Sequence, residues 1–296
     1  MKISVIIPTK NRPQDLLKAV ASIIAQNRLP DELILVDQSD SDASRPEIGE
    51  MIGNAGGSVR LNHIYDPRIR GLVDAKRVGA LNASGDIVYF LEDDIILEPD
   101  YIEQIEQGFA NHPKMVGCCG IITNSLPKPV GYEFIFHLFH RGIFRDIRVG
   151  LFGCFSGRGH PLIASDFLSG GMSAWRREVF FAVPFDVDSG FHMFEDIDFS
   201  TQVAKHFNSQ LYINPNARLE HYWSSINRET LGASQRLKVR ECILYYKKRR
   251  SWKGATFGIY WLLIGLFLES SVKSASNFSC EILWGYFLGI KDGCLA

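Results

Sequence analysis

The 296-residue sequence predicts an α/β fold built on a mostly parallel sheet. Short β-branched runs alternate with helical segments through the first 100 residues, which is typical of βαβ units. Polar clusters follow three of the apolar runs, at residues 9–12, 37–42 and 92–94. Because open α/β sheets bind ligands at the carboxyl ends of their strands, these clusters predict one shared site.

The expected elements follow in order along the first 91 residues. Four apolar or β-branched runs are expected as strands: 2–8, 33–36, 59–65 and 87–91. Pro13 opens a helix after the first strand, because the apolar residues from Leu16 to Ile24 recur at helical spacing. A second helix is expected from about residue 74 to 83, between the third and fourth strands.

Composition excludes several classes of protein. A chain with 46% hydrophobic and 22% charged residues is expected to form one large domain, or one domain with an appendage. The net charge of −1 gives no argument for binding nucleic acid. Six cysteines without metal-ligand spacing predict reduced thiols in a cytosolic setting. The apolar run 3–7 is too short for a signal peptide.

The apolar run 87–91 ends in three adjacent carboxylates, Glu92, Asp93 and Asp94. Carboxylates this close repel one another unless a cation lies among them, although an acidic loop without a ligand is the plain alternative. Carboxylate oxygens favour Mg²⁺ or Mn²⁺, whose remaining ligands are commonly phosphates. Five basic residues could balance those phosphates: Arg12, Arg68, Arg70, Lys76 and Arg77. Since the sequence has no P-loop and no GxGxxG after the first strand, a metal-held nucleoside diphosphate is the expected ligand.

A second acidic cluster comprises Glu195, Asp196 and Asp198. Acids at the start of a helix are favourable with the helix dipole, so this cluster has a purely structural explanation. However, the position of this cluster in a series of motifs indicates a functional explanation instead. The motifs are residues 5–12, 35–39, 71–77, 83–86, 90–94, 170–173, 176–177, 185–186 and 194–199. Together they resemble glycosyltransferase family 2, the inverting enzymes with the GT-A fold, of the bacterial surface-polysaccharide type. The resemblance spans about residues 1–225, with Glu92 where the family more often has Asp and Lys76-Arg77 where it often has Arg-Asn.

The resemblance implies a role for each matching residue. Asp37 would bind the base of the donor, Asp93 its ribose and Asp94 the metal, while Asp196 would be the general base. Residues implied to bind the donor are Pro8, Thr9, Asn11, Arg12, Asp37, Ser39, Lys76 and Asp93. Residues implied to bind Mn²⁺ or Mg²⁺ are Asp94, Glu92 and His221, and those implied to support the base are Glu195, Asp198 and Arg177.

The expected domains are a GT-A domain over residues 1–225 and a helical region over 226–296. Residues 1–100 form the donor and metal half of the GT-A domain, and 101–225, with an aromatic stretch at 132–160, the acceptor and base half. The C-terminal region contains a polybasic cluster at 247–253 and apolar runs at 254–268 and 282–290. Two interpretations remain open for it: a peripheral anchor on the cytoplasmic face of the inner membrane, or helices packed on the catalytic domain.

The expected function is metal-dependent, inverting transfer of a sugar from a nucleotide-diphosphate donor to a hydroxyl of a glycan or lipid-linked glycan. The alternative is a catalytically silent protein of the same fold that binds a nucleotide sugar or a glycan. A nucleotidyltransferase would typically have a Gly-rich basic loop after the first strand, where this chain has residues 9–12. No nucleic acid partner is expected.

Overall fold

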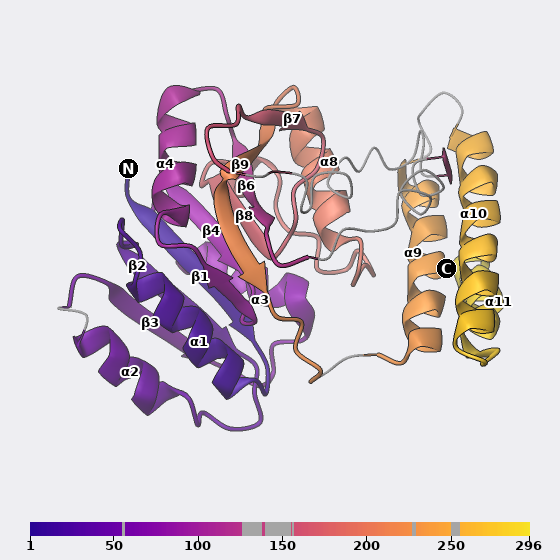
Figure 1. The fold of residues 1–296 in the computed structure, drawn as a ribbon, viewed down its shortest axis with the longest axis horizontal. Coiled ribbons are helices and arrows are strands. Elements are labelled where there is room, and N and C mark those ends of the chain that lie inside the picture. Colours follow the sequence, from indigo (N-terminus) through magenta and orange to yellow (C-terminus); the bar gives the residue numbers. More distant parts are fainter. Residues whose placement is uncertain (55–56, 126–137, 140–154, 156, 227–228, 250–254) are drawn as a thin grey trace. The chain divides into compact units, whose positions relative to one another are not determined.

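The computed structural model describes residues 1–54, 57–125, 138–139, 155, 157–226, 229–249 and 255–296 (Figure 1). The chain forms two compact units. The first, which we call the sheet unit, comprises Met1–Leu126 and Leu151–Ile226. The second, the helical unit, comprises Pro127–Gly150 and Asn227–Ala296. The aromatic stretch expected at 132–160 lies largely outside the described residues.

The sheet unit is built on a nine-stranded sheet within the described residues. Its strands are β1 Ile3–Thr9, β2 Glu32–Asp37, β3 Arg60–Tyr65, β4 Ile87–Leu91, β5 Ile95–Leu97, β6 Gly117–Ile122, β7 Ile163–Ser165, β8 Met172–Arg176 and β9 Leu211–His221. Their order is β3-β2-β1-β4-β8-β6-β9-β5, with β7 paired to β9. The first four of these strands in the sheet are the four strands that the sequence predicts, and all pair in parallel.

The second half of the sheet is mixed. β8 pairs antiparallel with both β4 and β6, and β5 pairs antiparallel with β9, whereas β6 and β9 are parallel. The predicted α/β class is confirmed, with the parallel pairing concentrated in the first half. β1, β2, β4 and β6 are buried along their whole length, which explains why their sequences are continuous apolar runs rather than alternating ones.

Helices connect these strands and cover the sheet. Those of the sheet unit are α1 Pro13–Ile24, α2 Arg45–Asn54, α3 Gly71–Asn82, α4 Tyr101–Asn111, α7 Val179–Ala182 and α8 Glu195–His206. α1 begins at Pro13 as predicted and buries Leu16, Val20 and Ile23. α2 was not expected from the sequence, because only Ile48 and Ile52 of its ten residues are buried and its apolar periodicity is weak.

The described helices of the helical unit are α9 Leu231–Arg249, α10 Ala255–Ser276 and α11 Glu281–Leu295, together with residues 138–139. The Trp261 indole nitrogen donates a hydrogen bond to the Leu138 carbonyl at 2.8 Å, and the rings of Phe139 and Trp261 lie 4.9 Å apart. Among the described residues, no helix combines the length and the apolar character that crossing a membrane requires.

A stripe of glycines joins α11 to α9. Gly285, Gly289 and Gly293 recur every four residues on one side of α11. A methyl group at Gly285 would lie 2.2 Å from the carbonyl oxygen of Gly232, and one at Gly289 would lie 2.5 Å from that of Arg236. The two helix backbones are therefore in direct contact along this stripe, at a separation that a larger side chain does not permit.

Candidate active site

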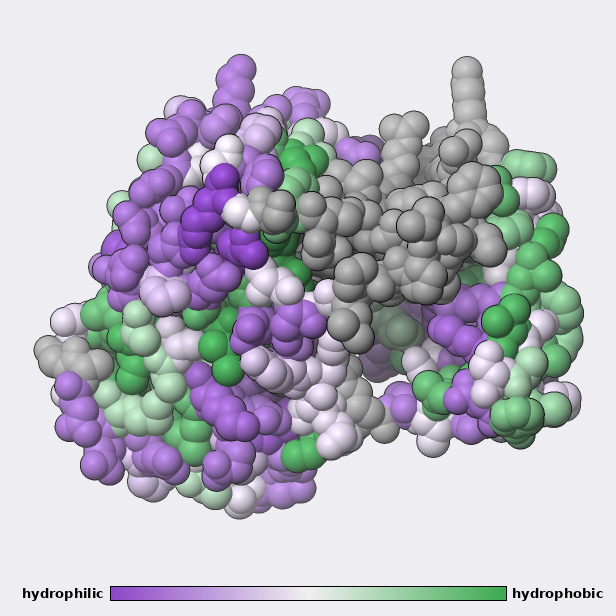
Figure 2. Space-filling model, viewed as in Figure 1, coloured by the Kyte–Doolittle hydropathy of each residue, from purple (hydrophilic) through white to green (hydrophobic). Residues whose placement is uncertain are grey.

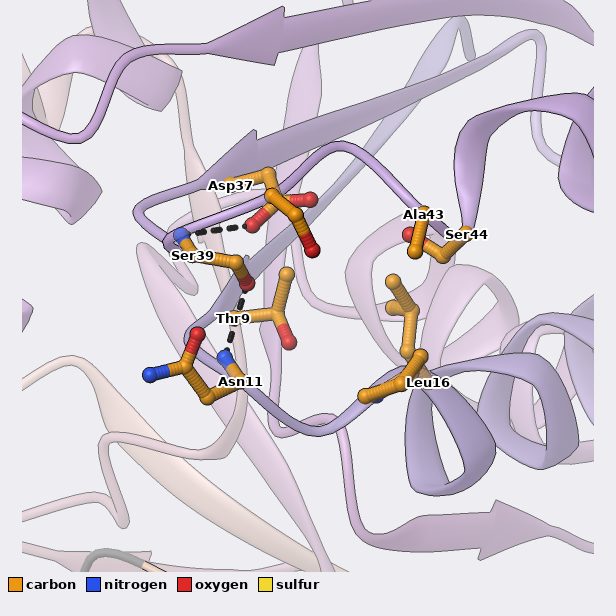
Figure 3. A pocket seen from close by; sticks show the side chains of 9 residues that line it. Thr9, Asn11, Leu16, Asp37, Ser39, Ala43 and Ser44 are labelled. Atoms are coloured by element: carbon orange, nitrogen blue, oxygen red, sulfur yellow. Dashed lines mark hydrogen bonds between the residues drawn. The ribbon is translucent and has the colours of Figure 1, made fainter.

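The carboxyl ends of β1 and β2 form the walls of a small polar pocket (Figure 3). Thr9, Asn11, Asp37 and Ser39 line it. The Asn11 backbone N–H donates to the Ser39 hydroxyl at 2.7 Å, and the Ser39 N–H donates to an Asp37 carboxylate oxygen at 2.9 Å. Asn11 has a φ of 55°, a left-handed conformation that asparagine tolerates better than most residues. These bonds fix the first two polar segments predicted to converge.

Asp37 is 1% exposed and its carboxylate faces the pocket. Burial alone would raise its pKa, but the contacts with His63 and Ser39 outweigh burial and hold the pKa below its usual range. His63, on β3, lies with Nε2 3.4 Å from Asp37, and its side chain is almost completely buried. Sequence reasoning missed His63, although a histidine inside a predicted strand next to the one ending in Asp37 was a usable signal. An ionised Asp37 can only accept hydrogen bonds, which suits the N–H edge of a base.

Asp93 and Arg12 connect the third polar segment to the first. The Thr9 hydroxyl donates to one Asp93 carboxylate oxygen at 2.7 Å, and Arg12 donates to the other at 3.0 Å. Burial raises the pKa of Asp93, with Thr9 and Arg12 acting in the opposite direction. Arg12 also lies 3.7 Å from Asp94. Within the described residues the buried Nε atom of Arg12 has no hydrogen-bond partner.

Asp94, Glu92 and His221 form a compact group that we call the triad. The imidazole Nε2 of His221 lies 3.0 Å from an oxygen of Asp94 and 3.0 Å from one of Glu92. The register of β5 and β9 explains this meeting, because Ile95, next to Asp94, pairs with His221. The second Asp94 oxygen accepts the Ser224 backbone N–H at 2.9 Å, a contact that sequence reasoning did not foresee.

The electrostatics of the triad favour a cation. Burial would lower the pKa of His221, but Asp94 and Glu92 outweigh burial and raise it to about 9. Burial would likewise raise the pKa of Asp94, yet His221 and Ser224 hold it below its usual range. One imidazole nitrogen and two carboxylates lie within 4.8 Å of one another, a separation compatible with binding one metal ion. The donor set suits Mn²⁺ and is acceptable for Mg²⁺.

Asp196 lies in the first turn of α8, beside Gly170 in the segment before β8. One of its carboxylate oxygens accepts the Gly170 backbone N–H at 3.1 Å, and the other accepts the Ile197 N–H at 2.8 Å. A methyl group on Gly170 would lie 2.9 Å from the Asp196 Cβ. A methyl group on the adjacent Gly171 would lie 2.3 Å from the Glu92 carboxyl group. These two glycines therefore let the backbone pass between Asp196 and the triad.

The structure brings most of the predicted residues to one edge of the sheet, but not all to their predicted places. Pro8 is buried in β1 and Ser39 lines the pocket. Asp198 on α8 accepts a hydrogen bond from Gln202 at 2.9 Å. The Lys76 ammonium contacts Glu195, not the pocket that contains Asp37. Arg177 is not brought to the site. It follows the end of β8 that pairs with the start of β4, one strand length from the acids.

The comparison with known families identifies the chain. The model of glycosyl transferase family 2 matches residues 4–181, so the chain belongs to this family. A glucosyl-dolichyl phosphate glucuronosyltransferase from Haloferax volcanii is 30% identical over 128 residues, which cover 42% of this chain and 39% of that protein. The chain therefore matches well under half the length of this relative.

Solved structures show the same fold at low sequence identity. The mannosyltransferase PcManGT from Pyrobaculum calidifontis, in complex with GDP-Man and Mn²⁺, has a TM-score of 0.62 at 13% identity over 98% of this chain and 86% of that one. GalNAc-T7 with UDP, GalNAc and Mn²⁺ has a TM-score of 0.56 at 15% identity over 94% of this chain and 58% of that one. These likenesses show the fold, which is GT-A.

Proposed function

We propose that this protein is a metal-dependent, inverting glycosyltransferase that moves a hexosyl or similar sugar from a nucleotide-diphosphate donor to a hydroxyl of a glycan or lipid-linked glycan. The main support is the arrangement at one edge of the sheet. Asp37, a carboxylate that can only accept hydrogen bonds, lies in the pocket, and the triad and Asp196 of α8 lie at the same edge. A metal bound at the triad would be Mn²⁺ or Mg²⁺ and would stabilise the charge that develops on the leaving nucleoside diphosphate.

Different residues of the chain have different roles in the proposed reaction. Asp37 accepts from the base, while Thr9 and Arg12 hold Asp93 in place for the ribose. The Arg12 guanidinium, which lies beside Asp93 and Asp94, supplies positive charge near the diphosphate. Asp196 removes the proton from the acceptor hydroxyl as that oxygen attacks the anomeric carbon from the face opposite the leaving group. A single displacement of this kind inverts the anomeric configuration.

Nucleotide binding that depends on metal tests the donor site. We expect one of UDP, GDP or dTDP, and not the monophosphate CMP, to raise the melting temperature only when Mn²⁺ is present, because a ligand that binds only the folded state stabilises it. Asp94→Ala should abolish this shift, whereas Asp188→Ala, which replaces an exposed aspartate outside the site, should retain it. Differential scanning fluorimetry measures both. The absence of a shift with any nucleotide in the wild-type protein would contradict the proposal. Metal-dependent binding without sugar transfer or donor hydrolysis would favour the silent binder instead.

The raised pKa of His221 gives a pH-dependent signature of metal binding. At pH 7 and without metal, an imidazole with a pKa of about 9 is protonated, and it must lose that proton to bind a metal. We therefore expect about one proton to be released per Mn²⁺ bound at pH 7, and affinity to rise up to about tenfold per pH unit until about pH 9. Calorimetry in PIPES and in Tris, which differ in ionisation enthalpy, measures the release. His221→Gln should lose it, and wild-type binding without proton release would exclude His221 as a ligand.

We further propose that the helical unit contacts a membrane surface, which would place the enzyme near a lipid-linked acceptor. Figure 2 shows hydrophobic residues along α10 and α11. Exposed apolar side chains form one stripe on each helix: Phe257, Tyr260, Ile264, Phe267, Leu268 and Val272 on α10, and Trp284, Phe287 and Leu295 on α11. The stripes adjoin, because the rings of Phe267 and Phe287 lie 6.2 Å apart.

The charge of this region fits an anionic lipid surface. Residues 226–296 contain 11 Lys and Arg against 5 Asp and Glu, whereas residues 1–225 contain 21 against 28. Basic residues beside exposed aromatic and aliphatic side chains are typical of interfacial helices. In flotation assays, we expect binding to vesicles that contain phosphatidylglycerol, weakened by salt and by the triple change Phe257→Ser, Ile264→Ser and Trp284→Ser. Leu81→Ser, at an exposed leucine of α3, is the matched control. Equal binding by the triple variant would contradict the proposal.

A further inference from the structure

We propose that Lys76 is a positioning residue for Asp196, acting through Glu195, and not a ligand of the donor phosphates. This inference rests on the proposed function of Asp196 as general base. The Lys76 ammonium lies 2.5 Å from a Glu195 carboxylate oxygen. Glu195 is the first residue of α8 and directly precedes Asp196. The pair therefore ties α3, which contains Lys76, to the turn that presents the base.

The pair is held away from solvent. The Lys76 side chain is 3% exposed and that of Glu195 is 8% exposed. Phe90 lies under the ammonium, 5.8 Å from ring centroid to Nζ, and Phe185 and Phe199 line the same small cavity. Removing two charges from water is costly, so the geometry that retains them must be well defined. A lysine that binds a donor phosphate would be expected to keep its ammonium group in contact with solvent when no ligand is bound.

Gly170 contacts both the Lys76–Glu195 pair and Asp196. A methyl group on Gly170 would lie 2.6 Å from both Lys76 Nζ and Glu195 Oε1, and the Gly170 N–H donates to Asp196 at 3.1 Å. The ammonium, the Glu195 carboxylate and one Asp196 oxygen therefore surround a single backbone position. A shift of Glu195 would displace both the start of α8 and the Gly170 donor, and with them the Asp196 carboxylate.

The charge of Lys76 has a second effect on this turn. Burial raises the pKa of Glu195, Lys76 lowers it, and the neighbouring Asp196 raises it further. Two adjacent carboxylates at one helix start repel each other when both are ionised. Lys76 offsets the charge of Glu195 and so weakens the repulsion between Glu195 and the adjacent Asp196.

The test separates positioning from donor binding. The variants are Lys76→Arg, Lys76→Met and the double variant Lys76→Met/Glu195→Met, which removes both charges and so keeps a folded protein available if the single change unfolds the chain. Each is assayed for Mn²⁺-dependent affinity for UDP and GDP by calorimetry. Each is also assayed for kcat and KM of hydrolysis of UDP-sugars and GDP-sugars, followed by release of the nucleoside diphosphate. Lys205→Met, at an exposed lysine of α8, is the control.

We expect the double variant to bind nucleotide with wild-type affinity and to lose about a hundredfold in kcat at unchanged KM, the effect of a base displaced by about 1 Å. Lys76→Arg should recover part of that loss, because it restores the charge. A nucleotide affinity weakened tenfold or more at unchanged kcat would overturn the inference and make Lys76 a donor ligand. Wild-type kcat in the double variant would overturn it as well. A wild-type protein that neither binds nor hydrolyses any donor would instead contradict the proposed function.

Discussion

Replacing Asp196 with asparagine is expected to lower kcat by about 10²–10⁴-fold, the usual contribution of a positioned general base. Asparagine preserves the shape of the side chain, and its oxygen can still accept the Gly170 N–H that now contacts Asp196 at 3.1 Å. It cannot take a proton from the acceptor hydroxyl. Because Asp196 does not line the pocket that contains Asp37, nucleotide affinity should stay within about twofold of wild type.

The measurement is steady-state kinetics of donor turnover, combined with calorimetric titration of the nucleotide. Asp198→Asn is the matched control, since Asp198 is two residues along α8 and is bound to Gln202. It should change kcat far less than Asp196→Asn. Equal losses for both variants would show that α8 tolerates no change there. An unchanged kcat in Asp196→Asn would assign the base to another residue.

Gly289→Leu is expected to have the largest effect on the stability of the helical unit. The new side chain would begin 2.5 Å from the Arg236 carbonyl oxygen, and backbone does not yield as a flexible side chain does. Overpacking of this kind costs about 1–3 kcal/mol and sometimes more. We expect an early loss of helical signal in thermal unfolding followed by circular dichroism at 222 nm, with metal-dependent nucleotide binding in the sheet unit retained.

The control for this prediction is Gly49→Leu on α2. Nothing lies within 4 Å of a methyl group at Gly49, and its helix lies in the sheet unit. Because leucine favours a helix more than glycine does, this variant should be neutral or stabilising by about 0.5–1 kcal/mol. If Gly289→Leu unfolds no earlier than the control, α9 and α11 are not in close contact in solution.

The sequence predicted the parallel half of the sheet well. β1, β2 and β4 each have a buried apolar run, whereas β3 is a partly exposed strand that mixes apolar and polar residues. The polar residues that follow β1, β2 and β4 lie together because parallel strands end at the same edge of a sheet. Thr9 contacts Asp93 at 2.7 Å, and Asn11 contacts Ser39 at 2.7 Å. These contacts follow from the parallel pairing of β1 with β2 and with β4, which the alternation of strands and helices predicted.

The rest of the site depends on pairings that local patterns do not contain. β5 has three residues, too few for any periodicity, yet its register with β9 places His221 beside Asp94. Only the resemblance indicated His221. Lys76 was assigned to phosphate because a basic residue near an acidic site commonly binds one, whereas burial against Glu195 depends on how α8 packs. Arg177 lies away from the site because β8 runs antiparallel to β4 and therefore ends at the edge of the sheet opposite to the one that contains the acids.

The contact between Trp261 and residues 138–139 has a consequence for how the protein is made. The chain passes from one unit to the other three times, after Leu126, Gly150 and Ile226. During synthesis, Leu138 leaves the ribosome long before Trp261, which follows it by 123 residues. Phe139 is therefore synthesised well before Trp261, its ring partner on α10. A gene shortened at residue 226 would encode a polypeptide that lacks Trp261, the ring partner of Phe139.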